Sequence, residues 1–90
     1  MKKSDLMLKE YSKRLSDEDL RFLNARFTQN LQDDHADIFN KLSTDKEVNH
    51  WLSTALSGLE FFAMVDKVGE FVVRESKRRT NVVVSEKDDN

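Results

Sequence analysis

The fold is decided by residues 44–79, whose sequence is TDKEVNHWLSTALSGLEFFAMVDKVGEFVVRESKRR. This stretch contains the only tryptophan and three of the six phenylalanines of the chain. Its apolar residues recur with the spacing of a helix face, since each helical residue turns by about 100°. Thr44 and Glu47 have the spacing of a capping box just before the first apolar residue. The sequence therefore predicts one long helix over residues 44–79.

This predicted helix carries two apolar stripes on nearly opposite faces. The apolar side chains from 48 to 63 share one face, and those from 61 to 72 share a face turned away from it by about 200°. Gly58 and Gly69 lie within the span, and each costs about 1 kcal/mol of helix stability relative to alanine. Two interpretations stay open: a helix kinked near either glycine around one core, or a straight helix with two packing partners.

Two further helices are expected before this stretch. Ser4 is placed to cap a short helix in which Leu8, Tyr11 and Leu15 recur at i, i+3 and i+7. Ser16 precedes three carboxylates, at 17–19, where the positive end of a helix dipole favours negative charge. A continuous second helix to about residue 42 fits the apolar pattern. A break at residues 33–35 is left open.

Short connections place successive helices antiparallel. We therefore predict an all-α fold, either a long αα-hairpin or a three-helix bundle with a short N-terminal helix. The first stripe, including Leu59, should pack on the second helix through residues such as Leu31. Residues 1–79 form the single predicted domain, and 80–90 are expected to be a flexible polar tail. A β-hairpin of 71–73 with 82–84 is the less favoured alternative, because its loop lacks turn residues.

Composition excludes several classes of protein. The chain has 90 residues, 36% of them charged, and a net charge of −2, so it has no overall attraction for phosphate backbones. The absence of cysteine excludes a disulfide scaffold and fits a reducing compartment. No apolar run approaches the roughly 20 residues that a membrane span requires. We expect a cytoplasmic protein.

No pattern in the sequence predicts catalysis. Asp33 and Asp37 share a helical face, but His35 does not, so too few ligands gather for a zinc site. There is no glycine-rich phosphate loop and no nucleophile motif. We expect a protein that is not an enzyme and has neither a metal site nor a cofactor.

The second stripe carries the functional prediction. An apolar face without a partner in its own chain usually marks an interface. We expect a helical protein–protein interaction module that forms a homodimer or binds another protein. The predicted interface residues are Phe61, Met64, Val65, Val68, Phe71 and Val72.

The alternative is a small nucleic-acid-associated regulator. Its phosphate contacts would come from Lys77, Arg78 and Arg79. Basic residues at the end of a helix more often complement the helix dipole. Such an interaction must weaken steeply as the salt concentration rises.

Overall fold

The computed structural model describes residues 2–29 and 35–88, with side chains described through residue 81. Every regular element in this part of the chain is a helix, so the predicted all-α class is confirmed. The helices are α1 (Lys3–Arg14), α2 (Asp17–Gln29), α3 (His35–Leu42), α4 (Lys46–Ser53) and α5 (Gly58–Asp88).

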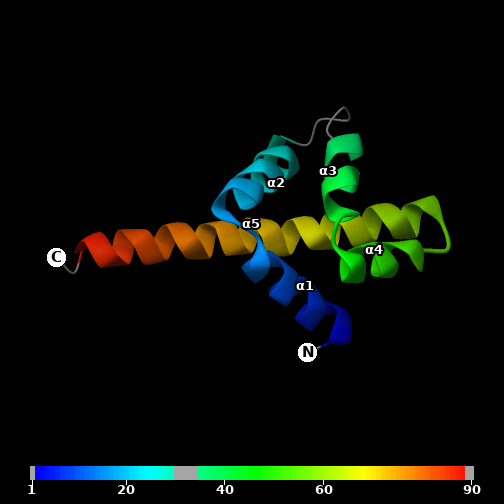
Figure 1. The fold of residues 1–90 in the computed structure, drawn as a ribbon, viewed down its shortest axis with the longest axis horizontal. Helices are drawn as coiled ribbons and strands as arrows, with labels where there is room; N and C mark the ends of the chain where they lie inside the picture. Colours follow the sequence, from blue (N-terminus) through cyan, green and yellow to red (C-terminus); the bar gives the residue numbers. More distant parts are fainter. Residues whose placement is uncertain (1, 30–34, 89–90) are drawn as a thin grey trace.

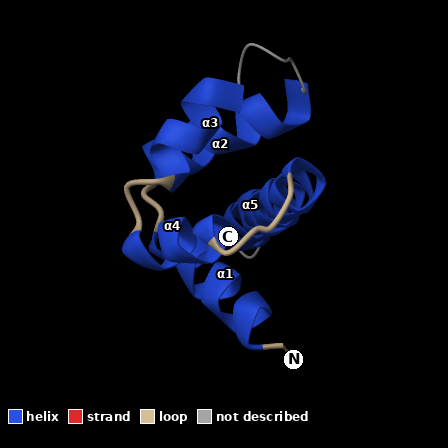
Figure 2. Ribbon diagram, turned by 90° about the vertical axis from the view of Figure 1, so that its right-hand side faces the viewer, coloured by secondary structure: helices blue, strands red, loops and turns tan. Residues whose placement is uncertain are grey.

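The long helix α5 runs through the middle of the molecule. Figures 1 and 2 show α2 and α3 on one side of it and α1 and α4 on the other. Each of the five helices contributes two side chains to a single core, and all ten are nearly inaccessible to solvent. They are Leu8, Tyr11, Leu20, Leu23, Ile38, Leu42, Val48, Leu52, Val68 and Val72.

The prediction of one helix over residues 44–79 is wrong, because the chain leaves the helical path between Ser53 and Gly58 and reverses. The first stripe is divided, with Val48 and Leu52 on α4 and its residues from Leu59 onward on α5. The second stripe lies wholly on α5. Val48 and Val68, taken from the two stripes, lie in the same core. The two stripes reach one core because the chain reverses between Ser53 and Gly58, and neither a kinked nor a straight continuous helix over 44–79 is present.

The second predicted helix is also divided. α2 ends at Gln29 and α3 begins at His35, and Figure 1 shows the two lying side by side. The Nζ of Lys41 on α3 lies 2.7 Å from an Oδ1 of Asp19 on α2, so an ion pair joins the two helices. Residues 30–34, with Leu31 and the acidic pair at 33–34, lie outside the described residues.

The helix starts follow the predicted capping chemistry in part. The Oγ of Ser16 accepts a hydrogen bond of 3.1 Å from the backbone N–H of Asp19, as expected for the cap of α2. The cap of α4 is Asp45, one residue beyond the predicted Thr44, and its carboxylate accepts from two backbone N–H groups. The prediction for Ser4 is wrong, since α1 begins at Lys3 and lacks a side-chain cap.

The C-terminal segment continues the long helix, and the flexibility expected of residues 80–90 stays a prediction. α5 continues through Asp88, and Figure 1 shows its C-terminal part extending beyond the other helices. The β-hairpin alternative is therefore wrong for the backbone of 71–88. The side chains of 82–84 lie outside the described part.

Candidate partner-binding surface

The predicted interface stripe lies largely inside the chain itself. Val68 and Val72 are completely buried, and Phe61, Met64, Val65 and Phe71 are partly buried against the same core. The reversal before Gly58 turns this face of α5 toward α1 and α2, which pack against it. Contacts within one chain thus cover the stripe for which the sequence predicted a partner.

A different set of apolar side chains faces solvent. Leu56 is 91% exposed and Leu59 is 85% exposed, at the turn before α5 and in its first turn. Phe62 on α5 and Phe39 on α3 are about half exposed. We call these four residues the turn surface. The prediction that Leu59 lies in a hairpin core is wrong, because that position depended on the continuous helix.

The turn that presents these side chains is held by local hydrogen bonds. The Oγ of Ser57 accepts from the backbone N–H of Glu60 at 3.1 Å, and an Oε2 of Glu60 accepts from the N–H of Leu56 at 2.6 Å. The Oγ1 of Thr54 donates to the carbonyl of Trp51 at 2.6 Å and closes the end of α4. These bonds fix the backbone on both sides of Leu56, so the apolar side chains project from an ordered turn.

Ser57 and Glu60 are a sequence signal for a helix start that the prediction of one long helix overlooked. Serine followed three residues later by glutamate is the capping-box pattern, and here it lies inside the stretch assigned to one helix. Gly58 follows the cap directly and has no neighbouring atom within 4 Å of an ideal Cβ position. This pattern predicts a helix start at residue 58, which is where α5 begins.

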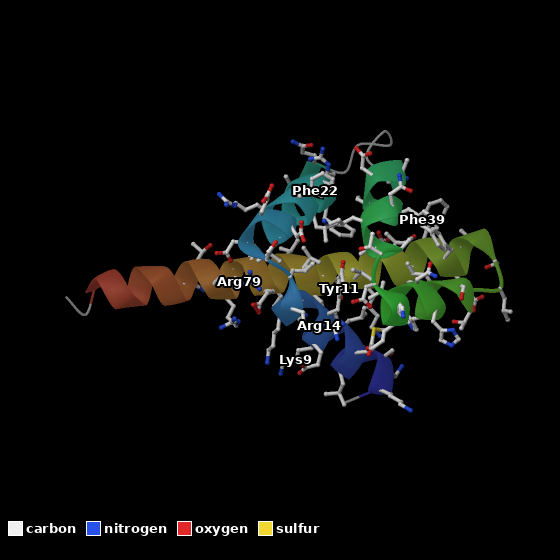
Figure 3. All side chains as sticks on the ribbon, viewed as in Figure 1. Lys9, Tyr11, Arg14, Phe22, Phe39 and Arg79 are labelled. Atoms are coloured by element: carbon white, nitrogen blue, oxygen red, sulfur yellow. The ribbon has the colours of Figure 1, made fainter. Side chains whose placement is uncertain are left out.

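Aromatic rings line one side of the turn surface. The ring centroids of Phe39 and Phe61 are 5.7 Å apart, and those of Phe61 and Phe62 are 6.0 Å apart with an edge-on arrangement. The ring of His35 lies 5.9 Å from that of Phe62. Figure 3 shows Phe39 between α3 and the N-terminal part of α5. Such pairs hold the rings in fixed orientations relative to one another.

A groove of about 430 Å³ adjoins these rings. None of its lining residues is ionisable, although 36% of the chain is charged. The polar groups in it are neutral amides and hydroxyls. The lining residues are Phe39, Asn49, Leu52, Ser53, Ala55, Leu56, Ser57, Gly58 and Phe61.

The three predicted phosphate contacts do not form one free cationic cluster. The guanidinium of Arg79 donates to the carbonyl of Leu15 at 2.8 Å, to two further carbonyls at the end of α1, and to Asp17 at 2.8 Å. Arg78 binds Glu75 through two nitrogens, at 2.7 and 2.8 Å. Lys77 is exposed and lines a separate groove beside Phe27.

Glu75 is the centre of this polar arrangement. It is only 6% exposed, and the bond from Arg78, together with that from Arg79, lowers its pKa below the ordinary value despite burial. Arg79 joins this carboxylate to the segment between α1 and α2, as its position in Figure 3 illustrates. Arg79 therefore has a structural role in holding α1 and α2 on α5.

The described residues contain neither a metal-binding cluster nor a membrane-spanning helix. No three side chains of the metal-binding types gather there closely enough to hold an ion. None of the helices combines the length and apolar character of a membrane span over that same part. Comparisons with protein-family models, with curated proteins and with solved structures gave no match.

Proposed function

We propose that this protein is a non-enzymatic interaction module that forms homodimers through the turn surface. The observation that supports this proposal best is the exposure of Leu56 and Leu59 on a turn held by the hydrogen bonds of Ser57 and Glu60. Exposed leucines are common singly, but several exposed apolar side chains beside a groove are typical of an interaction site. This surface replaces the predicted stripe, of which Val68 and Val72 lie in the core and the other four residues are partly buried against it.

A second copy of the chain is the partner that the charge pattern favours. In a two-fold symmetric dimer each residue near the axis faces its own equivalent, so a charged surface repels itself. The groove beside the turn surface has no ionisable residue among those that line it. Its amides and hydroxyls are able to pair with themselves across the axis as donors and acceptors.

The amount of accessible surface supports association. The chain exposes 6468 Å², against roughly 5,400 Å² for a compact monomer of this mass. The elongated shape, with extents of 51 × 31 × 19 Å, also enlarges this area. Specific interfaces bury at least about 1,000 Å² in total, around an apolar centre with a polar rim. The turn surface supplies that centre.

The homodimer proposal is tested by measuring the oligomeric state of the variant Leu59→Glu. Its side chain is 85% exposed, so the monomer should keep its fold, whereas a dimer would have to bury two glutamates near its axis. We expect sedimentation equilibrium to show a dimer for the native chain and a monomer for the variant, with unchanged helical circular dichroism.

Leu6→Glu is the matched control. Leu6 is a half-exposed leucine on α1, away from the turn surface, so the same change there should leave the dimer intact. A native chain that stays monomeric at high concentration would refute self-association. Equal dissociation by both variants would show that net charge, and not the turn surface, controls assembly.

The nucleic-acid alternative has weaker support. Of its three residues, Arg78 and Arg79 already bind Glu75, and Arg79 also binds the end of α1. Titration with duplex DNA at about 50 mM salt is the direct test, since phosphate contacts are strongest at low salt.

A further inference from the structure

Where α1 crosses α5, the two helices enclose a groove of about 250 Å³. We call it the α1–α5 groove. It shares no residue with the turn surface. Its lining residues are Lys9, Ser12, Lys13, Phe71, Arg74, Glu75 and Arg78.

Both walls of this groove are basic. Lys9 and Lys13 lie one turn apart on α1, and Arg74 and Arg78 lie one turn apart on α5. Glu75 is the single acidic residue of the lining, and Arg78 and Arg79 already neutralise it. The groove is therefore strongly positive on a chain whose net charge is −2.

These cations are available to a ligand. Lys9, Lys13 and Arg74 are exposed, and none of them takes part in an ion pair among the described side chains. The side chain of Arg78 is 57% exposed although it binds Glu75. Figure 3 shows Lys9 reaching away from α1 into solvent.

Phe71 is the one apolar side chain of the groove lining. Phe71 is half-buried, and the guanidinium carbon of Arg74 lies 5.3 Å from the centroid of its ring. A cation at this distance interacts favourably with an aromatic face and is held near it. The groove thus combines an aromatic base with flanking positive charges, and a matching ligand carries an apolar group between negative ones.

We propose that the α1–α5 groove binds a short acidic segment of a partner protein, in which an apolar side chain among carboxylates rests on Phe71. Arginine and lysine clusters recognise acidic motifs through charge-assisted hydrogen bonds. Carboxylates one helical turn apart on a ligand match the one-turn spacing of the cations on both walls.

An acidic segment fits better than a nucleic acid. Glu10 and Glu70 are exposed on the same two helices as the groove cations, so negative charge interrupts the basic surface there. A nucleic acid extends along its binding surface and needs a longer basic track, which a chain of net charge −2 does not favour. A short peptide needs only the groove.

The experiment measures fluorescence anisotropy of a labelled peptide with the central sequence Glu-Glu-Leu-Glu-Glu, at about 50 mM and about 150 mM salt. We expect Lys9→Gln with Lys13→Gln to weaken binding about tenfold, as loss of two partly exposed charge contacts predicts. Arg74→Gln, on the opposite wall, should weaken it in the same direction.

The matched control is Lys3→Gln with Lys77→Gln, which removes two exposed positive charges from the same two helices but outside the groove. It should bind the peptide within about twofold of the native chain, because charges in water act weakly at a distance. Leu59→Glu should also bind normally, so a failure of the dimer proposal leaves this one standing.

Three results would overturn the proposal. The first is the absence of peptide binding at the lower salt concentration. The second is an equal loss of affinity in the control, which would indicate attraction by net charge alone. The third is a single-stranded DNA 12-mer that binds more tightly than the peptide and loses affinity in the groove variants, which would assign the groove to phosphates.

Discussion

The ring of Phe27 on α2 lies directly against the backbone of Gly69 on α5. A Cβ at Gly69 would lie 2.7 Å from Cδ1 and 2.9 Å from Cε1 of Phe27, which are closer than real contacts allow, and a tight 3.1 Å from its Cγ. The absence of a side chain at residue 69 thus sets how closely α2 approaches α5. Any other residue at position 69 would place its Cβ in space that α2 already occupies.

Gly69→Ala should therefore destabilise the protein. Alanine gains about 1 kcal/mol of helix propensity over glycine, but overpacking costs about 1–3 kcal/mol, and the contacted Cγ is close to the backbone of Phe27, so the ring cannot simply swing away. Urea unfolding should show a net loss of about 1 kcal/mol. Gly58→Ala is the control and should be neutral or stabilising, since nothing lies near its Cβ position.

The same contact predicts a coupling between the two residues. In a Phe27→Ala background the space beside Gly69 is open, so Gly69→Ala should no longer destabilise. Additive effects of the two substitutions would show that α2 and α5 do not approach one another as described.

Arg79→Lys should lower the free energy of unfolding by about 2 kcal/mol. A lysine cannot reproduce the fork that donates to Asp17 and to the carbonyl of Leu15, and hydrogen bonds from a charged group contribute about 1.5–3 kcal/mol each. Denaturant unfolding measures the loss. Lys77→Ala removes a neighbouring, exposed basic side chain and should change stability by less than about 0.5 kcal/mol.

The losses of unfolding free energy caused by Leu52→Ala and by Leu59→Ala should distinguish a core position from a surface position. Leu52 is 3% exposed, and its truncation leaves a cavity that costs about 2–5 kcal/mol. Leu59 is exposed, so its truncation should cost the monomer less than about 0.5 kcal/mol. Thermal unfolding at low protein concentration compares them. Similar losses for both would restore Leu59 to a hairpin core.

The phenol of Tyr11 should lose its proton only at an unusually high pH. Its burial, with smaller contributions from the charges of Asp45 and Asp19, raises its pKa to about 12. It is the only tyrosine, so tyrosinate absorbance reports on it alone. The native chain should show this absorbance near pH 12, and the chain in urea near pH 10.

The raised pKa makes stability depend on pH in a defined window. Above about pH 10 the unfolded chain releases the phenolic proton and the folded chain keeps it, so the contribution of Tyr11 is full below pH 10 and is lost toward pH 12. Tyr11→Phe removes this group, and its unfolding free energy should fall less steeply over the same window. Parallel curves for both chains would contradict the burial of Tyr11.

Local sequence patterns determined the helical class and part of the core. The positions of Leu8 and Tyr11 on α1, of Val48 and Leu52 on α4, and the cap at Ser16 all follow from spacings of four residues or fewer. Such spacings are set within a helix, whatever the helix packs against. For this reason the buried stripes were recognisable even where the helix boundaries were wrong.

Only the tertiary structure decided what covers each stripe and which apolar side chains are left outside. An apolar stripe requires burial but does not specify the covering helix, and that choice depends on the direction of the chain after Ser53. Once the chain reverses there, the face with Val68 meets α1 and α2, and Leu59 projects into solvent. The contact between Arg79 and Leu15 spans 64 residues, and the α1–α5 groove joins Lys9 to Arg74 across a similar interval. Contacts at such separations depend on how whole helices pack, and the spacing of residues within one helix does not determine that packing.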